Sequence, residues 1–314
     1  MTTPRSELKN VPASVHARLL TFAKKEHRDF NQVLTQYFQE RLLDRLARSR
    51  YDEQFVLKGA LLFIGLEARS AAVRGRPTKD IDFEALGLHP ETDQIGAIFA
   101  EIAMLPSDPD DGVEFLIKDI KAEQIVEREE YEGVRVHLPA VLGKIKNRIQ
   151  IDVGFGDAIT PKPQRTAFPT LLDDYLPPQL LTYPLETVVA EKFEAAIDLA
   201  EANSRMKDFR DLYVLAVTTP FDGAVITEAM RRTFERRGTS LVAGSTVMSE
   251  GFAQDADRQS AWAGYLRKER IDSVPGSFEA VMPVILDFVG PPFRAAGEGS
   301  SFGRRWDPQS GRWR

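Results

Sequence analysis

Hydrophobic residues recur at three- and four-residue steps over two long stretches of the chain, residues 12–48 and 185–237. This spacing is typical of amphipathic helices, in which the apolar side chains line one face. In the first stretch a break at residues 27–31 predicts two helices rather than one. In the second stretch the segments 185–203, 206–217 and 226–237 predict three helices, and Gly238 stands where a helix is expected to end.

The pattern changes between residues 55 and 157, where short runs alternate apolar with polar residues. Residues 55–66 predict a strand or turn that leads into a buried helix, and Pro77 bars a helix just before the alternating residues 80–83. A helix is expected near residues 95–104. Further strands are predicted at 113–120, 133–138 and 147–155, the second of them opened by a turn at Glu132 and Gly133. These residues therefore predict a small lobe of mixed strands and helices.

Five segments follow from these patterns, and together they predict an α+β protein. They are an N-terminal helical segment (1–50), a lobe with a sheet (51–160), a proline-bearing connecting segment (161–178), a helical C-terminal lobe (179–292) and a flexible tail (293–314). The tail is predicted because it is rich in glycine, serine and arginine. Its aromatic residues among arginines leave a second interpretation open, in which they stack on RNA.

Composition limits the chemistry that is open to this chain. It has no cysteine among 314 residues and four scattered histidines, so a metal would be held by oxygen, which favours Mg²⁺ or Mn²⁺. Motifs of phosphate loops, serine hydrolases and zinc proteases are absent. The net charge of −6 is unlike that of a protein that coats nucleic acid, although a local basic patch stays open. With no long apolar run and no signal peptide, the cytoplasm is the expected location.

Three aspartates are the candidate metal ligands. Asp80 and Asp82 lie two apart on a predicted strand, so both carboxylates project from one face. They are about 7 Å apart at the backbone, close enough for the side chains to share a cation. Asp152 lies on another predicted strand, opposite in direction to the apolar Ile151 and Val153. A neighbouring strand would then bring a third carboxylate to the pair. Two other interpretations stay open: a solvated strand edge for the pair, and a simple turn for Asp152.

The helical lobe contributes a second set of charged candidates. Lys192 emerges from an apolar stripe, which is costly unless its ammonium meets an anion. That anion is either a core carboxylate or a bound phosphate. Asp208 and Asp211 share a helix face, where interaction with the helix dipole is the alternative to a functional role. The neighbouring Lys207 and Arg210 are expected to be solvated.

Five segments in this order resemble the AbiEii/AbiGii toxin family of nucleotidyltransferases, a branch of the DNA polymerase beta-like superfamily. They are FVLKGALL, RPTKDIDF, IQIDVGFGD, VVAEKFEA and NSRMKDFRDLYVLA, and the similarity runs from about residue 10 to about residue 290. The resemblance implies a polymerase-beta-like lobe with a mixed sheet, preceded by N-terminal helices and followed by a helical lobe. It also implies a toxin of a bacterial toxin–antitoxin pair. Characterised relatives add nucleotides to the 3′ end of tRNA, which blocks aminoacylation and arrests growth.

The resemblance further implies roles for individual residues. The implied metal ligands are Asp80, Asp82 and Asp152, with Asp152 as metal ligand or general base, and the catalytic set also includes Lys192 and Asp211. The implied nucleotide-binding residues are Lys58, Gly59, Thr78, Lys192 and Asp208. Ala60 departs from the family, which usually has serine there, so Thr78 is the expected replacement for that hydroxyl.

The implied ligands and partners are Mg²⁺ or Mn²⁺, a nucleoside triphosphate, an RNA acceptor such as tRNA, and an antitoxin that is a winged-helix DNA-binding repressor. Two alternatives to RNA modification stay open. One is transfer of a nucleotide or phosphate to a protein, and the other is a catalytically silent nucleotide-binding module.

Overall fold

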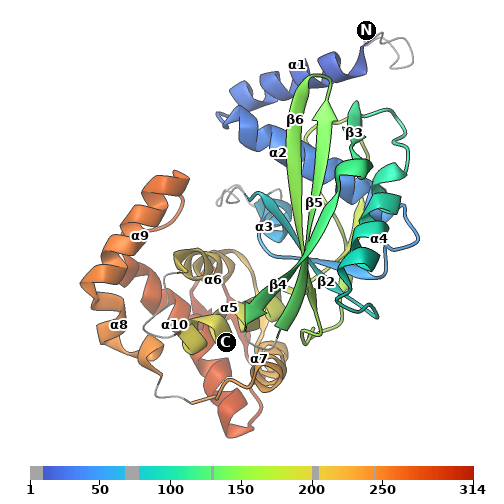
Figure 1. Cartoon of the computed structure of the whole chain (residues 1–314). Coiled ribbons are helices and arrows are strands. Elements are labelled where there is room, and N and C mark those ends of the chain that lie inside the picture. The colour runs from blue at the N-terminus through green and yellow to red at the C-terminus, as the bar shows by residue number, and fades with distance from the viewer. Residues whose placement is uncertain (1–9, 68–77, 129–130, 200–204, 243–244) are drawn as a thin grey trace. The chain divides into compact units, whose positions relative to one another are not determined.

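The computed structural model of the chain (Figure 1) describes residues 10–67, 78–128, 131–199, 205–242 and 245–314. Residues 10–67, 78–128, 131–156 and 164–182 form one compact unit, here called the sheet unit. The remaining described residues, 157–163, 183–199, 205–242 and 245–314, form the helical unit. The ends of three predicted segments, at residues 76–77, 200–203 and 203–204, lie outside the described residues.

The sheet unit is built on a mixed sheet of eight strands, which confirms the predicted fold class. In chain order the strands are β1 (Phe55–Lys58), β2 (Asp80–Ala85), β3 (Val113–Phe115), β4 (Lys121–Arg128), β5 (Tyr131–Leu142), β6 (Ile145–Phe155), β7 (Gln164–Ala167) and β8 (Gln179–Thr182). Their order in space is β3-β5-β6-β2-β1-β8-β7, and β4 also pairs with β5. The pairs β2–β6 and β1–β8 are parallel and the others are antiparallel.

Helices α2 (Phe30–Ala47) and α4 (Thr92–Met104) pack on this sheet, and α2 lies behind β5 and β6 in Figure 1. The rings of Phe55, Phe83 and Phe99 meet there at centroid distances of 5.1–6.1 Å, a typical spacing for packed aromatic side chains. Helix α1 (Val11–Lys25) precedes α2, and α3 (Leu61–Glu67) follows β1. Asp29 caps α2 by accepting two backbone N–H groups, which explains the predicted break between the first two helices.

Helix α2 also carries a buried carboxyl group. Glu40 is fully buried, contacts the buried guanidinium of Arg41, and accepts the backbone N–H of Leu171 at 2.8 Å. The Arg41 guanidinium lies 4.0 Å from the ring centroid of Tyr175. Burial raises the pKa of Glu40 to about 7, and Arg41 only partly opposes this shift.

This raised pKa predicts a stability that falls as pH rises. Between the ordinary pKa of 4.5 and about 7 the folded chain keeps a proton on Glu40 that the unfolded chain releases. The free energy of unfolding should therefore drop by up to about 3 kcal/mol across this window. Urea unfolding at a series of pH values checks this. Glu40→Gln should flatten the slope, whereas Glu114→Gln at an exposed position should leave it in place.

The helical unit contains the three predicted helices and three further ones. They are α5 (Leu185–Leu199), α6 (Met206–Thr218), α7 (Gly223–Arg237), α8 (Glu250–Gln254), α9 (Ala256–Glu269) and α10 (Phe278–Glu298). Gly238 ends α7 in the left-handed conformation with φ of 68°, as its position predicts. Three short strands form a second sheet, β9 (Phe221–Asp222), β10 (Arg305–Asp307) and β11 (Arg312–Trp313).

The predicted flexible tail from residue 293 is wrong. Residues 293–298 are the last turns of α10, and the chain end forms two strands that pair next to β9. Trp306 is buried, and its indole N–H donates to the carbonyl of Ala216 at 2.6 Å. The indole N–H of Trp313 lies 3.0 Å from the carbonyl oxygen of Phe288. Burial of Trp306 and the hydrogen bonds of both indoles hold the chain end, and this burial leaves the ring of Trp306 unavailable for stacking on RNA.

Other boundaries also differ from those predicted. The N-terminal helices belong to the sheet unit, and residues 164–182 of the connecting segment and the helical lobe supply β7 and β8 to the sheet. Strand β5 already begins at Tyr131, so Glu132 and Gly133 lie in a strand rather than in a turn. None of the described helices has the length and apolarity that crossing a membrane requires.

Candidate functional site

A row of charged residues crosses the middle of the sheet. In register, Lys58 of β1 pairs with Asp82 of β2, Asp82 with Asp152 of β6, and Asp152 with Arg135 of β5. Residues directly opposite on neighbouring strands project to the same face, and Asp80 joins them because it lies two positions before Asp82. The three predicted carboxylates therefore share one face. The apolar neighbours of Asp152 on β6, Ile151 and Val153, are fully buried on the other face, as predicted.

Asp152 is held by a neighbouring strand rather than by the pair of aspartates. Arg135 donates two parallel hydrogen bonds to its carboxylate, each 2.8 Å long, and Gln150 lies 3.2 Å from Oδ2. This bidentate geometry is the strong form of an arginine–carboxylate pair. Hydrogen bonding to Asp152 raises the pKa of Arg135 above its ordinary value, and the charge of Asp80 adds to the effect. Arg135 is thus a site residue that the sequence patterns did not single out.

The donor set of this face suits a hard cation, because the three acidic residues offer oxygen ligands only. Among the described residues, however, no three acidic or histidine side chains converge closely enough to hold a metal ion. The third carboxylate, that of Asp152, is instead paired with Arg135. By the chemistry of their oxygen ligands, Asp80 and Asp82 are the residues that would hold Mg²⁺, and Asp152 would join them only on leaving Arg135.

Gly59 explains how the Asp82 carboxylate is placed. It follows β1 with φ of 73°, and a Cβ added at this position would lie 1.9 Å from Oδ2 of Asp82. A side chain at residue 59 and the observed Asp82 carboxylate thus exclude each other. The structure shows that Gly59 makes room for Asp82, and its contact with a triphosphate stays a prediction.

Gly59→Ala should accordingly damage the site more than the fold. The left-handed backbone alone should cost about 1–2 kcal/mol in the free energy of unfolding. Displacement of the Asp82 carboxylate should reduce the nucleotidyl transfer that the resemblance implies about 100-fold. Gly87→Ala is the matched control, because Gly87 has φ of 68° with open space around it. Equal losses of activity in the two variants would contradict the proposed role of Gly59.

Two other predicted nucleotide-binding residues have structural partners. The ammonium of Lys58 lies 2.9 Å from a carboxylate oxygen of Glu84, and both side chains are largely buried. Gly154 leaves room for this pair, because a Cβ there would lie 2.7 Å from the Lys58 ammonium. The hydroxyl of Thr78 accepts the backbone N–H of Asp80 at 3.4 Å. Thr78 thus helps to fix the start of β2, and contacts of Lys58 and Thr78 with phosphate stay predictions.

In the helical unit the remaining predicted residues form one ion-paired cluster. The ammonium of Lys192 on α5 lies 2.8 Å from Asp208 Oδ1 and 2.9 Å from Asp211 Oδ2, both on α6. Only 12% of the Lys192 side chain is exposed, and the two carboxylates are buried. Of the two predicted alternatives for Lys192, the structure shows the core carboxylates. Its contact with a phosphate stays a prediction.

Two arginines complete this cluster. Arg205 lies 2.8 Å from the second oxygen of Asp208, and Arg210 lies 3.2 Å from Asp211. Burial raises the pKa of Asp208, but the positive charges of Lys192 and Arg205 outweigh it and hold the pKa below its ordinary value. The prediction of a solvated Arg210 is wrong, because this side chain is fully buried beside Asp211.

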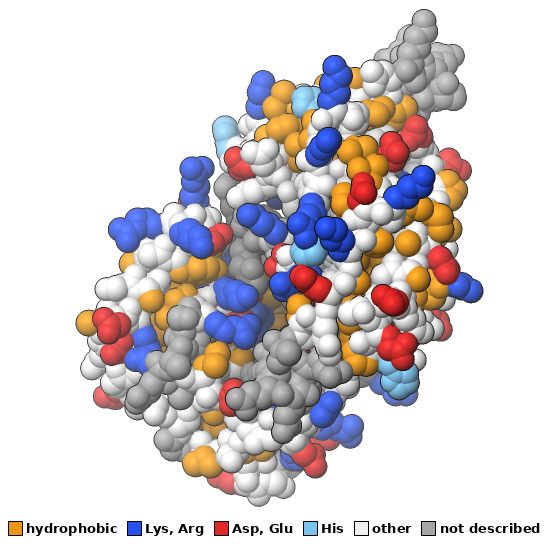
Figure 2. Space-filling model, viewed as in Figure 1, with side chains coloured by type: hydrophobic (Ala, Val, Ile, Leu, Met, Phe, Trp, Pro, Cys, Tyr) orange, Lys and Arg blue, Asp and Glu red, His pale blue; other side chains and the backbone are white. Residues whose placement is uncertain are grey.

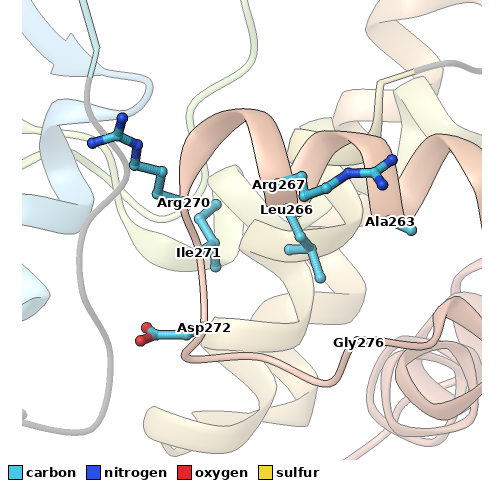
Figure 3. A pocket seen from close by; sticks show the side chains of 7 residues that line it. All are labelled: Ala263, Leu266, Arg267, Arg270, Ile271, Asp272 and Gly276. Atoms are coloured by element: carbon cyan, nitrogen blue, oxygen red, sulfur yellow. The ribbon is translucent and has the colours of Figure 1, made fainter.

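A pocket of about 570 Å³ lies elsewhere in the helical unit, at the end of α9 (Figure 3). It is lined by Ala263, Leu266, Arg267, Arg270, Ile271, Asp272 and Gly276. The two arginine side chains point away from each other in Figure 3, so they do not converge on one anion. None of the predicted site residues lines this pocket.

Comparison with known proteins bears directly on this arrangement. A family model described as nucleotidyl transferase AbiEii toxin, Type IV TA system, matches residues 41–295 and so spans both units. No curated protein matches the chain.

Two solved structures of Helicobacter pylori proteins are similar in fold. JHP933 is 14% identical with a TM-score of 0.49, and the match covers 86% of this chain and 94% of that protein. A candidate nucleotidyltransferase is also 14% identical, with a TM-score of 0.45 and coverage of 86% and 96%. Both likenesses are too distant to assign a function, whereas the family match covers most of the sequence. The chain belongs to the AbiEii family of nucleotidyl transferase toxins of Type IV toxin–antitoxin systems.

Proposed function

We propose that this protein transfers a nucleotide from a nucleoside triphosphate to an RNA acceptor, the 3′ end of tRNA, and thereby blocks translation. The observation that supports this most is the register of the sheet, which sets Asp82 directly beside Asp152 and places Asp80 on the same face. Paired carboxylates on neighbouring strands are the kind of site that holds metal ions for phosphoryl transfer. The proposal therefore rests on the sheet unit.

In the proposed reaction the RNA 3′-hydroxyl attacks the α-phosphorus of the triphosphate. A new P–O bond forms, the bond to the β-phosphate oxygen breaks, and pyrophosphate leaves with the electron pair. Asp80 and Asp82 would hold Mg²⁺, which when bound supplies Lewis acidity and neutralises phosphate charge. Asp152 takes the proton of the attacking hydroxyl, and Arg135 orients its carboxylate. Most of the rate enhancement comes from positioning and electrostatic stabilisation.

The proposal assigns the cationic and polar residues to the nucleotide. Lys58, Gly59 and Thr78 lie next to the carboxylates in the sheet unit, and they would contact the triphosphate there. In the helical unit, Lys192 and Asp208 would bind the nucleotide as the family resemblance implies, with Asp208 and Asp211 fixing the Lys192 ammonium. The partner in the cell would be an antitoxin, a winged-helix DNA-binding repressor encoded alongside, because Type IV systems pair a toxin with an antitoxin.

The test is direct incubation of the purified protein with tRNA, Mg²⁺ and each labelled nucleoside triphosphate in turn. The expected result is label in the RNA at its 3′ end, which periodate oxidation of the terminal 2′,3′-diol to a dialdehyde should prevent. Parallel reactions contain a cell protein fraction in place of RNA. Label in protein alone would show a protein acceptor, and growth inhibition without any transfer would show a silent nucleotide-binding toxin.

A further inference from the structure

The face of the sheet that bears the three carboxylates continues as a basic surface along β6 and its neighbours. Arg148 and Lys146 precede Asp152 on β6 at even spacing, so they project to the same side as Asp152. Lys121 of β4 joins them, because its register partner His137 pairs in turn with Gln150 of β6. Figure 2 shows lysine and arginine side chains gathered beside a histidine over β5 and β6.

These cations differ from the others of the site in having no acidic partner. Lys121, Lys146 and Arg148 are exposed, and none forms an ion pair within the part of the chain that the structure describes. The acidic side chains on this face are Glu123, 3.4 Å from His137, Asp80, the register partner of Gln150, and Glu114, whose register partner Val141 pairs in turn with Lys146. On a chain with a net charge of −6, such a run of exposed positive charge indicates a surface for an anionic partner.

Its position relative to the carboxylates indicates which partner. Arg148 lies about 13 Å and Lys146 about 20 Å along the strand from Asp152, so the positive charge leads away from the reacting centre in one line. A free triphosphate is too short to reach from the carboxylates to Lys146. A polyanion whose end enters the site would place its following phosphates over these residues.

We infer that this basic surface, formed by Lys121, Lys146 and Arg148, binds the backbone phosphates of the RNA acceptor just behind its reacting 3′ end. The inference rests on the proposed function and names the acceptor surface of the same site. Contacts of this kind position RNA without reading its sequence. The surface therefore sets how the acceptor approaches, while other contacts select the RNA.

The experiment compares the double variant Lys146→Gln/Arg148→Gln with the wild type. Loss of two phosphate contacts should raise the KM for tRNA about tenfold and reduce the slope of log Kd against log salt by about 1.5. The KM for the nucleoside triphosphate and the turnover at saturating tRNA should stay unchanged. Binding of labelled tRNA is measured separately from transfer. The matched control is Lys24→Gln/Lys25→Gln, two exposed lysines at the end of α1 that bring the same change in charge.

The outcomes separate this inference from the proposed function. If the wild type modifies tRNA and the double variant keeps its KM and salt slope, the surface is wrongly assigned. If the wild type modifies no RNA, the proposed acceptor is wrong, and an unchanged Kd for tRNA in the variant then overturns the surface too. Loss of antitoxin binding with an unchanged KM for tRNA would identify a protein-docking face instead and would also contradict the inference.

Discussion

Asp82→Asn should reduce nucleotidyl transfer by at least about 1,000-fold, or about 4 kcal/mol of transition-state stabilisation. Asp82 is central to the site, because it is the register partner of both Lys58 and Asp152. Asparagine keeps the shape of the side chain and removes the charge that a divalent cation needs. Transfer is measured as label in tRNA under single-turnover conditions, so that binding and chemistry are distinguished.

The fold should tolerate this change. Asparagine has almost the same size and shape as aspartate, so packing is kept and the melting temperature should change little. Asp110→Asn is a suitable control, because Asp108 and Asp110 repeat the Asp-x-Asp pattern in an exposed loop of the same unit. It should leave transfer unchanged. Full activity in Asp82→Asn would remove the basis for metal-dependent catalysis at this face.

Local alternation was enough to predict the strands that carry the site. The sequence Asp80-Ile81-Asp82-Phe83 can satisfy its apolar residues only with Ile81 and Phe83 in the core, so both aspartates must share the opposite face. The same reasoning holds for Asp152 between Ile151 and Val153. We expected β2 and β6 to be neighbours because each strand carries its aspartates on the polar face. The exact register of Asp82 with Asp152 depends on the whole sheet, and no local pattern contains it.

The partners of the charged residues could not be predicted, because each partner lies on another strand and neither segment alone contains the register between them. Arg135 meets Asp152 through a long hairpin, and Lys58 meets Glu84 across two strands whose pairing is non-local. The one available signal for Arg135 was its place in an alternating strand, on the polar side. The ordered chain end was missed for another reason: its glycine and arginine content is typical of disorder, whereas burial of Trp306 decides the outcome.

Lys192→Met should lower the free energy of unfolding by about 3–5 kcal/mol. Methionine fills the space of the aliphatic stem but leaves two buried carboxylates, Asp208 and Asp211, without the ammonium that both contact within 3 Å. Arg205 and Arg210 each compensate one of them only, so the lower end of this range is expected. Urea unfolding at pH 7 measures the loss. Lys207→Met is the control, since an exposed lysine on α6 should change stability by less than about 0.5 kcal/mol.

The pH dependence shows whether buried charge causes the loss. In the wild type the lowered pKa of Asp208 contributes stability above the ordinary value of 3.8, and this contribution is lost as pH falls. Without Lys192, burial and the charge of Asp211 raise the pKa of Asp208 instead. Protonation of Asp208 then stabilises the folded variant. The difference in the free energy of unfolding between variant and wild type should therefore narrow as pH falls from 7 towards 4. Lys192→Met/Asp211→Asn should recover part of the stability at pH 7, because one unpaired charge is gone. A difference that stays constant with pH, with no recovery in the double variant, would mean that packing around Lys192 stabilises the helical unit rather than its charge.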